Sequence, residues 1–221
     1  MPIVEDACQS ILANINHKNA GTWGEFGAFS LHPLKNFHMF GDGGMITTNS
    51  TEIKIKLDRL RNHGLIDRNK CEEFSRNSRL DALQASYGKY LLPYLEDWTE
   101  RVIKIAEYYH SEFKEFCYVP KTREHVRSVY HNYVIQTQHR NELSLYLKEN
   151  GIETKIHYPI PIHKQVAFKK QFGLISLPKT EKYIVITIYG LSLKTRRSFL
   201  KWLRLVKNYP KLENKSIKIL N

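Results

Sequence analysis

One lysine, Lys35, lies in the short segment LHPLKN, between two apolar runs and just before the sequence GDGG. Asp6 stands at the end of the strand-like run PIVED, and Ser30 stands at the end of the run GAFS. Functional side chains often follow the strands of an open α/β sheet. A lysine held close to packed strands is a candidate amine nucleophile, and a serine hydroxyl can donate to a phosphate. These residue types indicate a site that combines an amine, a carboxylate and an anion-binding hydroxyl.

Each residue alone has a simpler interpretation. An aspartate in the place of Asp6 is more often a helix cap, and a loop lysine is more often a solvent-exposed charge. The GDGG segment permits close approach of a ligand, but alone it is a weak motif. Together the residues fit pyridoxal 5'-phosphate, which needs a Schiff-base lysine, an acid against its pyridine nitrogen and donors for its phosphate. We therefore expect Lys35, Asp6 and Ser30 to fill these three roles.

The chain is strongly basic, with a net charge of +12 over 221 residues. Such a charge can indicate a nucleic-acid partner. The basic residues are spread along the chain, however, and none of the common recognition motifs is present. We therefore expect no nucleic-acid partner, and the charge also fits an acidic or nucleotide-linked substrate.

Three cysteines and ten histidines show no metal-binding spacing. An odd number of cysteines without a C-x-x-C pair favours a reducing compartment over a disulfide framework. The N-terminus has no basic segment followed by an apolar run, and no stretch approaches the ~20 apolar residues of a membrane span. We therefore expect a cytoplasmic protein with no metal site and no membrane contact.

The pattern of apolar residues predicts an α/β fold in two parts. The first part, residues 1–115, contains strand-like runs, a helix that Gly64 ends, and a long amphipathic helix that Pro93 divides. The second part, residues 116–221, is predicted as a small α/β domain. The strands are expected over 2–8, 27–32, 43–49, 129–137 and 152–163, the last of them broken by Pro159 and Pro161. The helices are expected over 51–64, 78–113, 140–151 and 196–209.

The sequence resembles the DegT/DnrJ/EryC1/StrS family of sugar aminotransferases. The resemblance rests on the segments VEDACQS, GTWGEFGAFSLHPLKN, GDGGMITTN, LRNHG, NSRLDALQA and KIHYPIPIH, which follow in the family's order over nearly the whole chain. It implies an aspartate-aminotransferase type of fold, of which this chain holds a partial large domain and the small domain. It also implies a homodimer that transfers an amino group from glutamate or glutamine to a keto sugar, usually nucleotide-linked, for polysaccharide or glycoconjugate synthesis.

The resemblance also implies roles for single residues. Lys35 stands at the Schiff-base lysine, and Asp6 at the partner of the pyridine nitrogen. Gln9 stands beside the cofactor's phenolic oxygen, and Ser30 matches the phosphate-binding serine. Two further residues carry over. Asn77 matches the asparagine that reaches the phosphate in the neighbouring subunit, and His163 matches a histidine directed towards the substrate.

The chain also differs from the family's pattern. Family members are much longer, and the strand that carries the aspartate lies near their middle, whereas here it begins at residue 2. The resemblance thus implies that the N-terminal part of the large domain, with a phosphate-binding turn and a ring-stacking aromatic residue, is absent. Three interpretations stay open: a fragment, a degenerate gene product, or half of a split enzyme that a second chain completes.

Two other functions compete with the aminotransferase. Dehydratases of the same family replace the Schiff-base lysine with histidine, so Lys35 argues against that activity. A non-catalytic remnant or interaction protein that keeps the dimer surface is the main alternative, and failure to bind the cofactor would support it.

Overall fold

The computed structural model describes the chain except residues 138, 183–184, 189–203, 207 and 210–221. The chain divides into two compact units. Unit 1 consists of residues 1–104 and 122–131, and unit 2 consists of residues 105–121 and 132–221. Across the described residues, no helix is both long and apolar enough to cross a membrane. The domain boundary expected near residue 115 stays a prediction.

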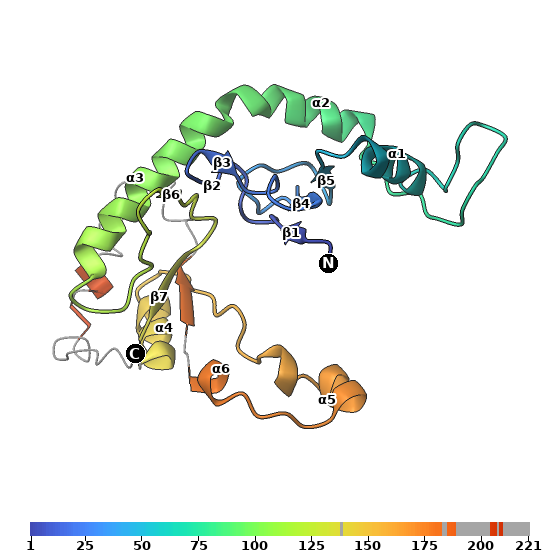
Figure 1. Ribbon diagram of the computed structural model, residues 1–221. Coiled ribbons are helices and arrows are strands. Elements are labelled where there is room, and N and C mark those ends of the chain that lie inside the picture. Colours follow the sequence, from blue (N-terminus) through green and yellow to red (C-terminus); the bar gives the residue numbers. More distant parts are fainter. Residues whose placement is uncertain (138, 183–184, 189–203, 207, 210–221) are drawn as a thin grey trace. The chain divides into compact units, whose positions relative to one another are not determined.

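The sheet that carries the candidate site lies in unit 1 and has the strand order β1-β4-β5. β1 (Val4–Asp6) runs parallel to β4 (Phe26–Ser30), and β5 (Gly44–Thr47) is antiparallel to β4. The short strands are blue at the N-terminal end of the chain in Figure 1. The three strands predicted from the apolar runs are confirmed, each a few residues shorter than expected. Three shorter strands of unit 1 form a second sheet: β2 (Asn14–Ile15), β3 (Lys18–Asn19) and β6 (Val126–Arg127).

The predicted long helix is observed in pieces, as its proline requires. α2 (Ala82–Leu91) continues through the 3₁₀ turn η1 (Leu92–Tyr94) into α3 (Leu95–Phe113). Pro93 lies in the turn, where its missing N–H and ring clash would disrupt a regular α-helix. The three elements follow one another in green in Figure 1.

A hydrophobic core joins the sheet of unit 1 to these helices. Leu31 follows β4, Leu91 ends α2 and Leu95 begins α3, and all three side chains are buried. Gly88 of α2 packs so closely that an added Cβ would lie 2.2 Å from the Cε of Met39. This packing fixes the segment between β4 and β5, which carries Lys35. The buried members of the core are Leu31, Phe37, Met39, Leu91 and Leu95.

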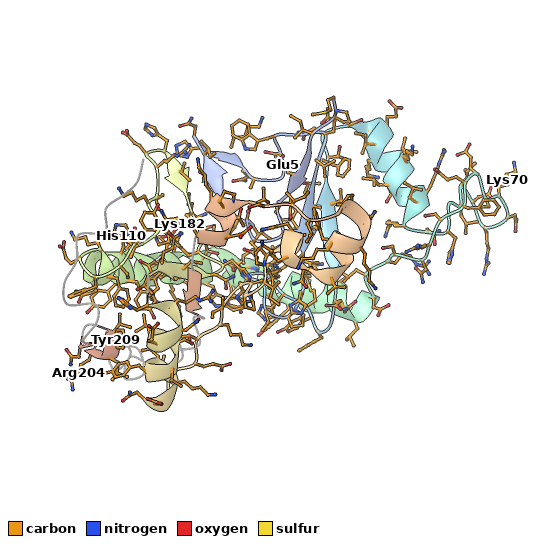
Figure 2. The ribbon with its side chains drawn as sticks, turned by 90° about the horizontal axis from the view of Figure 1, so that it is seen from below. Glu5, Lys70, His110, Lys182, Arg204 and Tyr209 are labelled. Atoms are coloured by element: carbon orange, nitrogen blue, oxygen red, sulfur yellow. The ribbon has the colours of Figure 1, made fainter. Side chains whose placement is uncertain are left out.

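A long loop follows helix α1 (Thr51–Leu60) in the sequence. Ser50 caps this helix by accepting a hydrogen bond from the Ile53 N–H at 3.2 Å. Figure 1 shows the loop extending away from the strands of unit 1, and Figure 2 labels Lys70 at its far end. Phe74 of this loop is exposed.

Unit 2 is built on the antiparallel pair of β7 (Tyr133–Gln136) and β8 (Val185–Ile188). Helix α4 (Arg140–Glu149) buries Leu143 and Leu147 completely, and Ile135 of β7 is also fully buried. These two leucines are four residues apart, a spacing that places both side chains on one face of a helix, and the helix predicted over 140–151 is confirmed. The remaining elements are η2 (Ile162–Lys164), α5 (Val166–Phe172) and α6 (Pro178–Lys182).

Two expectations for unit 2 need comment. The strand predicted over 152–163 is wrong, because the structure has no strand there and begins η2 at Ile162. Pro159 and Pro161 supply no N–H for a strand ladder. The helix predicted over 196–209 lies largely outside the described residues, of which 204–206 are helical.

Candidate active site

The register of β1 and β4 places two candidate residues on one face of the sheet. Asp6 pairs with Ala28 across the parallel ladder. Side chains alternate between the two faces along a strand, so Asp6, Ala28 and Ser30 share a face. Both Asp6 and Ser30 are the last residues of their strands. The carboxyl ends of two neighbouring parallel strands thus bring a carboxylate and a hydroxyl together.

The Asp6 carboxylate is exposed and held by the turn that follows β1. Its Oδ1 accepts a hydrogen bond from the Cys8 N–H at 3.1 Å. The Cys8 thiol and this N–H lower the pKa of Asp6 and outweigh the opposing effect of burial, and the positive charge of Lys35 adds a smaller lowering. Asp6 therefore carries a full negative charge at neutral pH.

Lys35 lies in a tight loop that begins directly after β4. Its N–H donates to the carbonyl oxygen of His32 at 2.9 Å. The His32 Nδ1 accepts from the Leu34 N–H at 3.1 Å, and the Ser30 Oγ accepts from the His32 N–H at 3.3 Å. The Lys35 side chain is half-buried. The positive charge of Lys35 makes only a small contribution to the lowered pKa of Asp6, so the expected pairing of this amine and this carboxylate in one site stays a prediction.

The residue after Lys35 anchors this loop to another part of unit 1. The Asn36 Nδ2 donates to the carbonyl oxygen of Val129 at 3.0 Å, and its Oδ1 lies 3.0 Å from the Nδ1 of His131. Val129 is 3% exposed. These contacts fix the chain one residue from the amine, across more than 90 residues of sequence.

The glycine-rich segment between Lys35 and β5 is held against helix α2. The Gln84 Nε2 donates to the carbonyl oxygen of Phe40 at 2.7 Å and to that of Asp42 at 3.1 Å. Gly41 has a φ of +83°, a backbone conformation that glycine adopts without strain. The GDGG segment therefore turns the chain between the loop that carries Lys35 and the start of β5.

The other predicted residues have different surroundings. Gln9 is exposed in the turn after β1. Asn77 is exposed in the loop that follows α1, where its Oδ1 accepts from the Arg79 Nε at 2.9 Å. His163 belongs to unit 2, is 4% exposed, and has its Nε2 3.1 Å from the Oε1 of Glu181. The roles expected for these three residues stay predictions.

Two residues beside the site were not predicted from the sequence. Cys8 contacts Asp6 through its backbone N–H, and its thiol lies 3.7 Å from the carbonyl oxygen of Ala28. Glu5 precedes Asp6 and binds the loop that leads into β4. The alternation along PIVED could have shown that Glu5 and Asp6 point to opposite faces, but it could not have shown what Glu5 binds.

The chemistry of this donor set fits pyridoxal phosphate. A primary amine can join its aldehyde, an ionised carboxylate can pair with its pyridine nitrogen, and a serine hydroxyl can bind its phosphate. Asp6 and Ser30 carry a carboxylate and a hydroxyl at the adjacent ends of β1 and β4, and Lys35 carries a primary amine in the loop after β4. Within the described part of the chain, no group of three or more His, Cys, Asp or Glu side chains is arranged to hold a metal ion.

Comparison with known proteins gives a family and a fold. The model of the DegT/DnrJ/EryC1/StrS aminotransferase family matches residues 1–193. A dTDP-3-amino-3,6-dideoxy-alpha-D-galactopyranose transaminase of Aneurinibacillus thermoaerophilus is 39% identical over 173 residues, which cover 77% of this chain and 47% of that protein. A pleiotropic regulatory protein of Geobacillus stearothermophilus is 37% identical over 185 residues, which cover 81% of this chain and 50% of that protein. This chain spans about half the length of the curated relatives that it matches.

A solved structure agrees with these matches. The crystal structure of S. venezuelae DesV, determined in complex with a ketimine intermediate, superposes with a TM-score of 0.88 at 31% identity. The match covers 98% of this chain and 59% of the DesV chain. The chain belongs to the DegT/DnrJ/EryC1/StrS aminotransferase family. The predicted α/β fold, part of the aspartate-aminotransferase type, is thereby confirmed.

Proposed function

We propose that this chain provides the cofactor-binding part of a pyridoxal-phosphate-dependent sugar aminotransferase. The observation that carries the proposal is that Asp6 and Ser30 end two neighbouring parallel strands, β1 and β4, and that Lys35 lies in the loop directly after β4. The substrate class is a nucleotide-linked sugar with a keto group at carbon 3. Its support is the names of relatives, which include a dTDP-3-amino sugar transaminase and a UDP-N-acetyl-3-dehydro-alpha-D-glucosamine 3-aminotransferase.

In this proposal the chain's own residues divide the work. When bound, the cofactor supplies an electron sink for the carbon that loses its proton. The Asp6 carboxylate pairs with the pyridine nitrogen and holds a proton there. The Lys35 amine anchors the cofactor. Once an amino donor has displaced Lys35 from the cofactor, the free amine moves a proton between the Cα of the donor and the cofactor. The Ser30 hydroxyl donates to the phosphate.

Three further roles belong to the same proposal. Gln9 follows β1 closely enough to lie beside the cofactor's phenolic oxygen, and Asn77 lies on an exposed loop that extends from unit 1. In a homodimer, Asn77 of one subunit binds the phosphate in the other, and His163 approaches the sugar. Glutamate or glutamine is the amino donor. The free thiols of Cys8, Cys71 and Cys117 support a reducing, cytoplasmic location.

The ionisation of Asp6 gives this proposal a pH dependence. Because contacts in the fold lower its pKa, Asp6 stays charged above its ordinary pKa and loses its charge as the pH falls through the lowered value. We therefore expect cofactor chemistry that depends on Asp6 to be constant near neutral pH and to fail only in strong acid.

The test is a visible absorption spectrum of the purified chain with pyridoxal phosphate, beside Lys35→Ala and Lys35→Arg. The account predicts a band that both variants lose, since arginine keeps the charge but has no primary amine. Added glutamate should then change the band and release one equivalent of 2-oxoglutarate, and continued release should require a nucleotide-linked keto sugar. A folded wild-type chain without the band would favour a non-catalytic interaction protein of this family.

A further inference from the structure

Glu5 lies on the face of the sheet opposite to Asp6. It pairs with Gly27 in the β1–β4 ladder, while Asp6 pairs with Ala28. Successive side chains point to opposite faces of a strand, so the Glu5 carboxylate is directed away from the candidate site. Figure 2 labels Glu5 among the strands of unit 1. Glu5 can therefore affect the site through the backbone of β1 and its neighbours or through its charge, but not by direct contact.

The Glu5 carboxylate accepts three backbone hydrogen bonds from one loop. Its Oε2 accepts from the Gly21 N–H at 2.7 Å, and its Oε1 accepts from the Trp23 N–H at 2.5 Å and the Gly24 N–H at 2.8 Å. Hydrogen bonds to an ionised acceptor are roughly twice as strong as those between neutral groups. The loop 21–24 leads directly into β4.

The loop is packed so closely that it has little freedom to shift. A Cβ added to Gly24 would lie 2.4 Å from the carbonyl oxygen of Ile3. A Cβ added to Gly27 would lie 2.3 Å from the Cα of Gly21. The Thr47 Oγ1 also donates to the carbonyl oxygen of Gly21 at 2.6 Å. Loop 21–24 is thus fixed to β1 by Glu5, to β4 by contact and to β5 by Thr47.

These contacts determine how β1 and β4 are aligned. A slip of one residue between two strands would move every side chain to the other face. Asp6 would then leave the face that it shares with Ser30. We propose that Glu5 is a positioning residue, which fixes the register of β1 against β4 and thereby holds Asp6 on the face that it shares with Ser30. This inference rests on the proposed function for the meaning of the Asp6 position, but the clamp itself is a property of this chain alone.

The charge of Glu5 is needed for this clamp. Partial burial raises the pKa of Glu5, but the N–H groups of Gly24, Gly21 and Trp23 outweigh it and lower the pKa overall, with a smaller contribution from Lys18. Because the pKa in the folded chain is below the ordinary value, the stabilisation is fully present above the ordinary value and is lost as the pH falls through the lowered one.

The test compares Glu5→Ala and Glu5→Gln with the wild-type chain by NMR, without cofactor. Glu52→Ala, at an exposed position in the first turn of α1, is the matched control. In Glu5→Ala, the amides of Gly21, Trp23 and Gly24 should exchange with solvent at least about tenfold faster, because a charged acceptor is lost. Glu5→Gln keeps one acceptor oxygen, so it should give an intermediate rate. The amides of α2 should be unaffected.

A second readout separates positioning from charge. Removing a negative charge near Asp6 would by itself lower the pKa of Asp6. Loss of positioning should instead raise this pKa towards its ordinary value, because Asp6 moves away from the positive charge of Lys35. Carbon NMR titration of the Asp6 carboxyl measures the direction, and Glu52→Ala should leave it unchanged.

The outcomes are distinct. Faster exchange confined to loop 21–24 with a raised Asp6 pKa supports the inference. Unchanged exchange, acceleration spread equally over unit 1, or an Asp6 pKa that is unchanged or lower overturns it. If the wild-type chain forms no visible band with pyridoxal phosphate while Asp6 still responds to Glu5, the proposed function fails and the positioning role stands.

Discussion

The polar side chains of interest have different exposure and different hydrogen-bond partners in the two units. In unit 1, Asp6 is exposed and Lys35 is half-buried, and backbone contacts at the strand ends fix their places. In unit 2, His163 is 4% exposed and its Nε2 lies 3.1 Å from Glu181. The same Glu181 oxygen accepts from the Lys164 Nζ at 3.0 Å and from the Leu177 N–H at 3.1 Å.

This difference indicates which unit presents polar groups that could bind a ligand. The cluster around Glu181 holds η2 against the start of α6 and also fixes the ring of His163, the residue proposed to approach the sugar. In unit 1, a carboxylate and a hydroxyl lie at the ends of β1 and β4, and an amine lies in the loop after β4. A site needs groups that face outward and a frame that keeps them in place. The proposed cofactor site of unit 1 depends on both features.

The largest expected effect comes from removing the amine. Lys35→Ala should abolish amino transfer completely, and Lys35→Arg should do the same, because neither side chain can join an aldehyde. Release of 2-oxoglutarate from glutamate measures the activity. Lys56→Ala, at an exposed position of α1, is the control and should be as active as the wild type. Activity that survives in Lys35→Ala would contradict the assignment.

The next effect concerns the charge partner. Asp6→Asn keeps the size of the side chain but removes its charge, so the pyridine nitrogen loses the group that holds its proton. We expect turnover to fall by roughly 10²–10³-fold while the cofactor still attaches to Lys35. Stopped-flow spectra with glutamate separate attachment from turnover, and equal turnover in both proteins would remove the role given to Asp6.

A smaller effect is expected at the anchor of the Lys35 loop. Asn36→Ala removes hydrogen bonds to Val129 and His131, so unfolding should become about 1–3 kcal/mol easier. Urea unfolding followed by fluorescence measures the change. Lys54→Ala removes only an exposed ion pair with Asp58 and should cost less than about 0.5 kcal/mol. If the two variants are equally stable, the anchor does not stabilise the loop.

The last prediction concerns unit 2 and acid. Hydrogen bonds from Lys164, Leu177 and His163 lower the pKa of Glu181 to about 2. Glu181→Gln should therefore be less stable than the wild type at neutral pH. The difference should shrink as the pH falls from the ordinary value of 4.5 towards 2, because Glu181 becomes protonated. Urea midpoints at several pH values test this, and a constant difference would argue against the cluster.

Features of the fold and the candidate site could be predicted from the sequence where they depend on residues that are close along the chain. The ends of β1 and β4 follow from short apolar runs, so Asp6 and Ser30 were found as strand-end residues. The position of Lys35 in the loop after β4 could also be predicted, because Lys35 lies five residues after Ser30. The resemblance of six segments then supplied the cofactor and the fold.

Other features depend on contacts that sequence patterns do not contain. The clamp by Glu5 joins β1 to a loop 16 to 19 residues away, and the Asn36 anchor spans 93 residues to Val129. The strand predicted over 152–163, which Pro159 and Pro161 were expected to break, was wrong, because neither proline can donate a hydrogen bond to a strand ladder. The partner of His163 was also missed, since Glu181 lies 18 residues further on.

The most direct test of the central claim is to find which lysine carries the cofactor. The chain is mixed with pyridoxal phosphate, reduced with borohydride to fix the linkage, digested and mapped by mass spectrometry. The account predicts that the label lies on Lys35 and is absent from exposed lysines such as Lys56 and Lys89 when the cofactor is equimolar. A label spread over these surface lysines, with Lys35 unmodified, would show that the ends of β1 and β4 do not form a cofactor site.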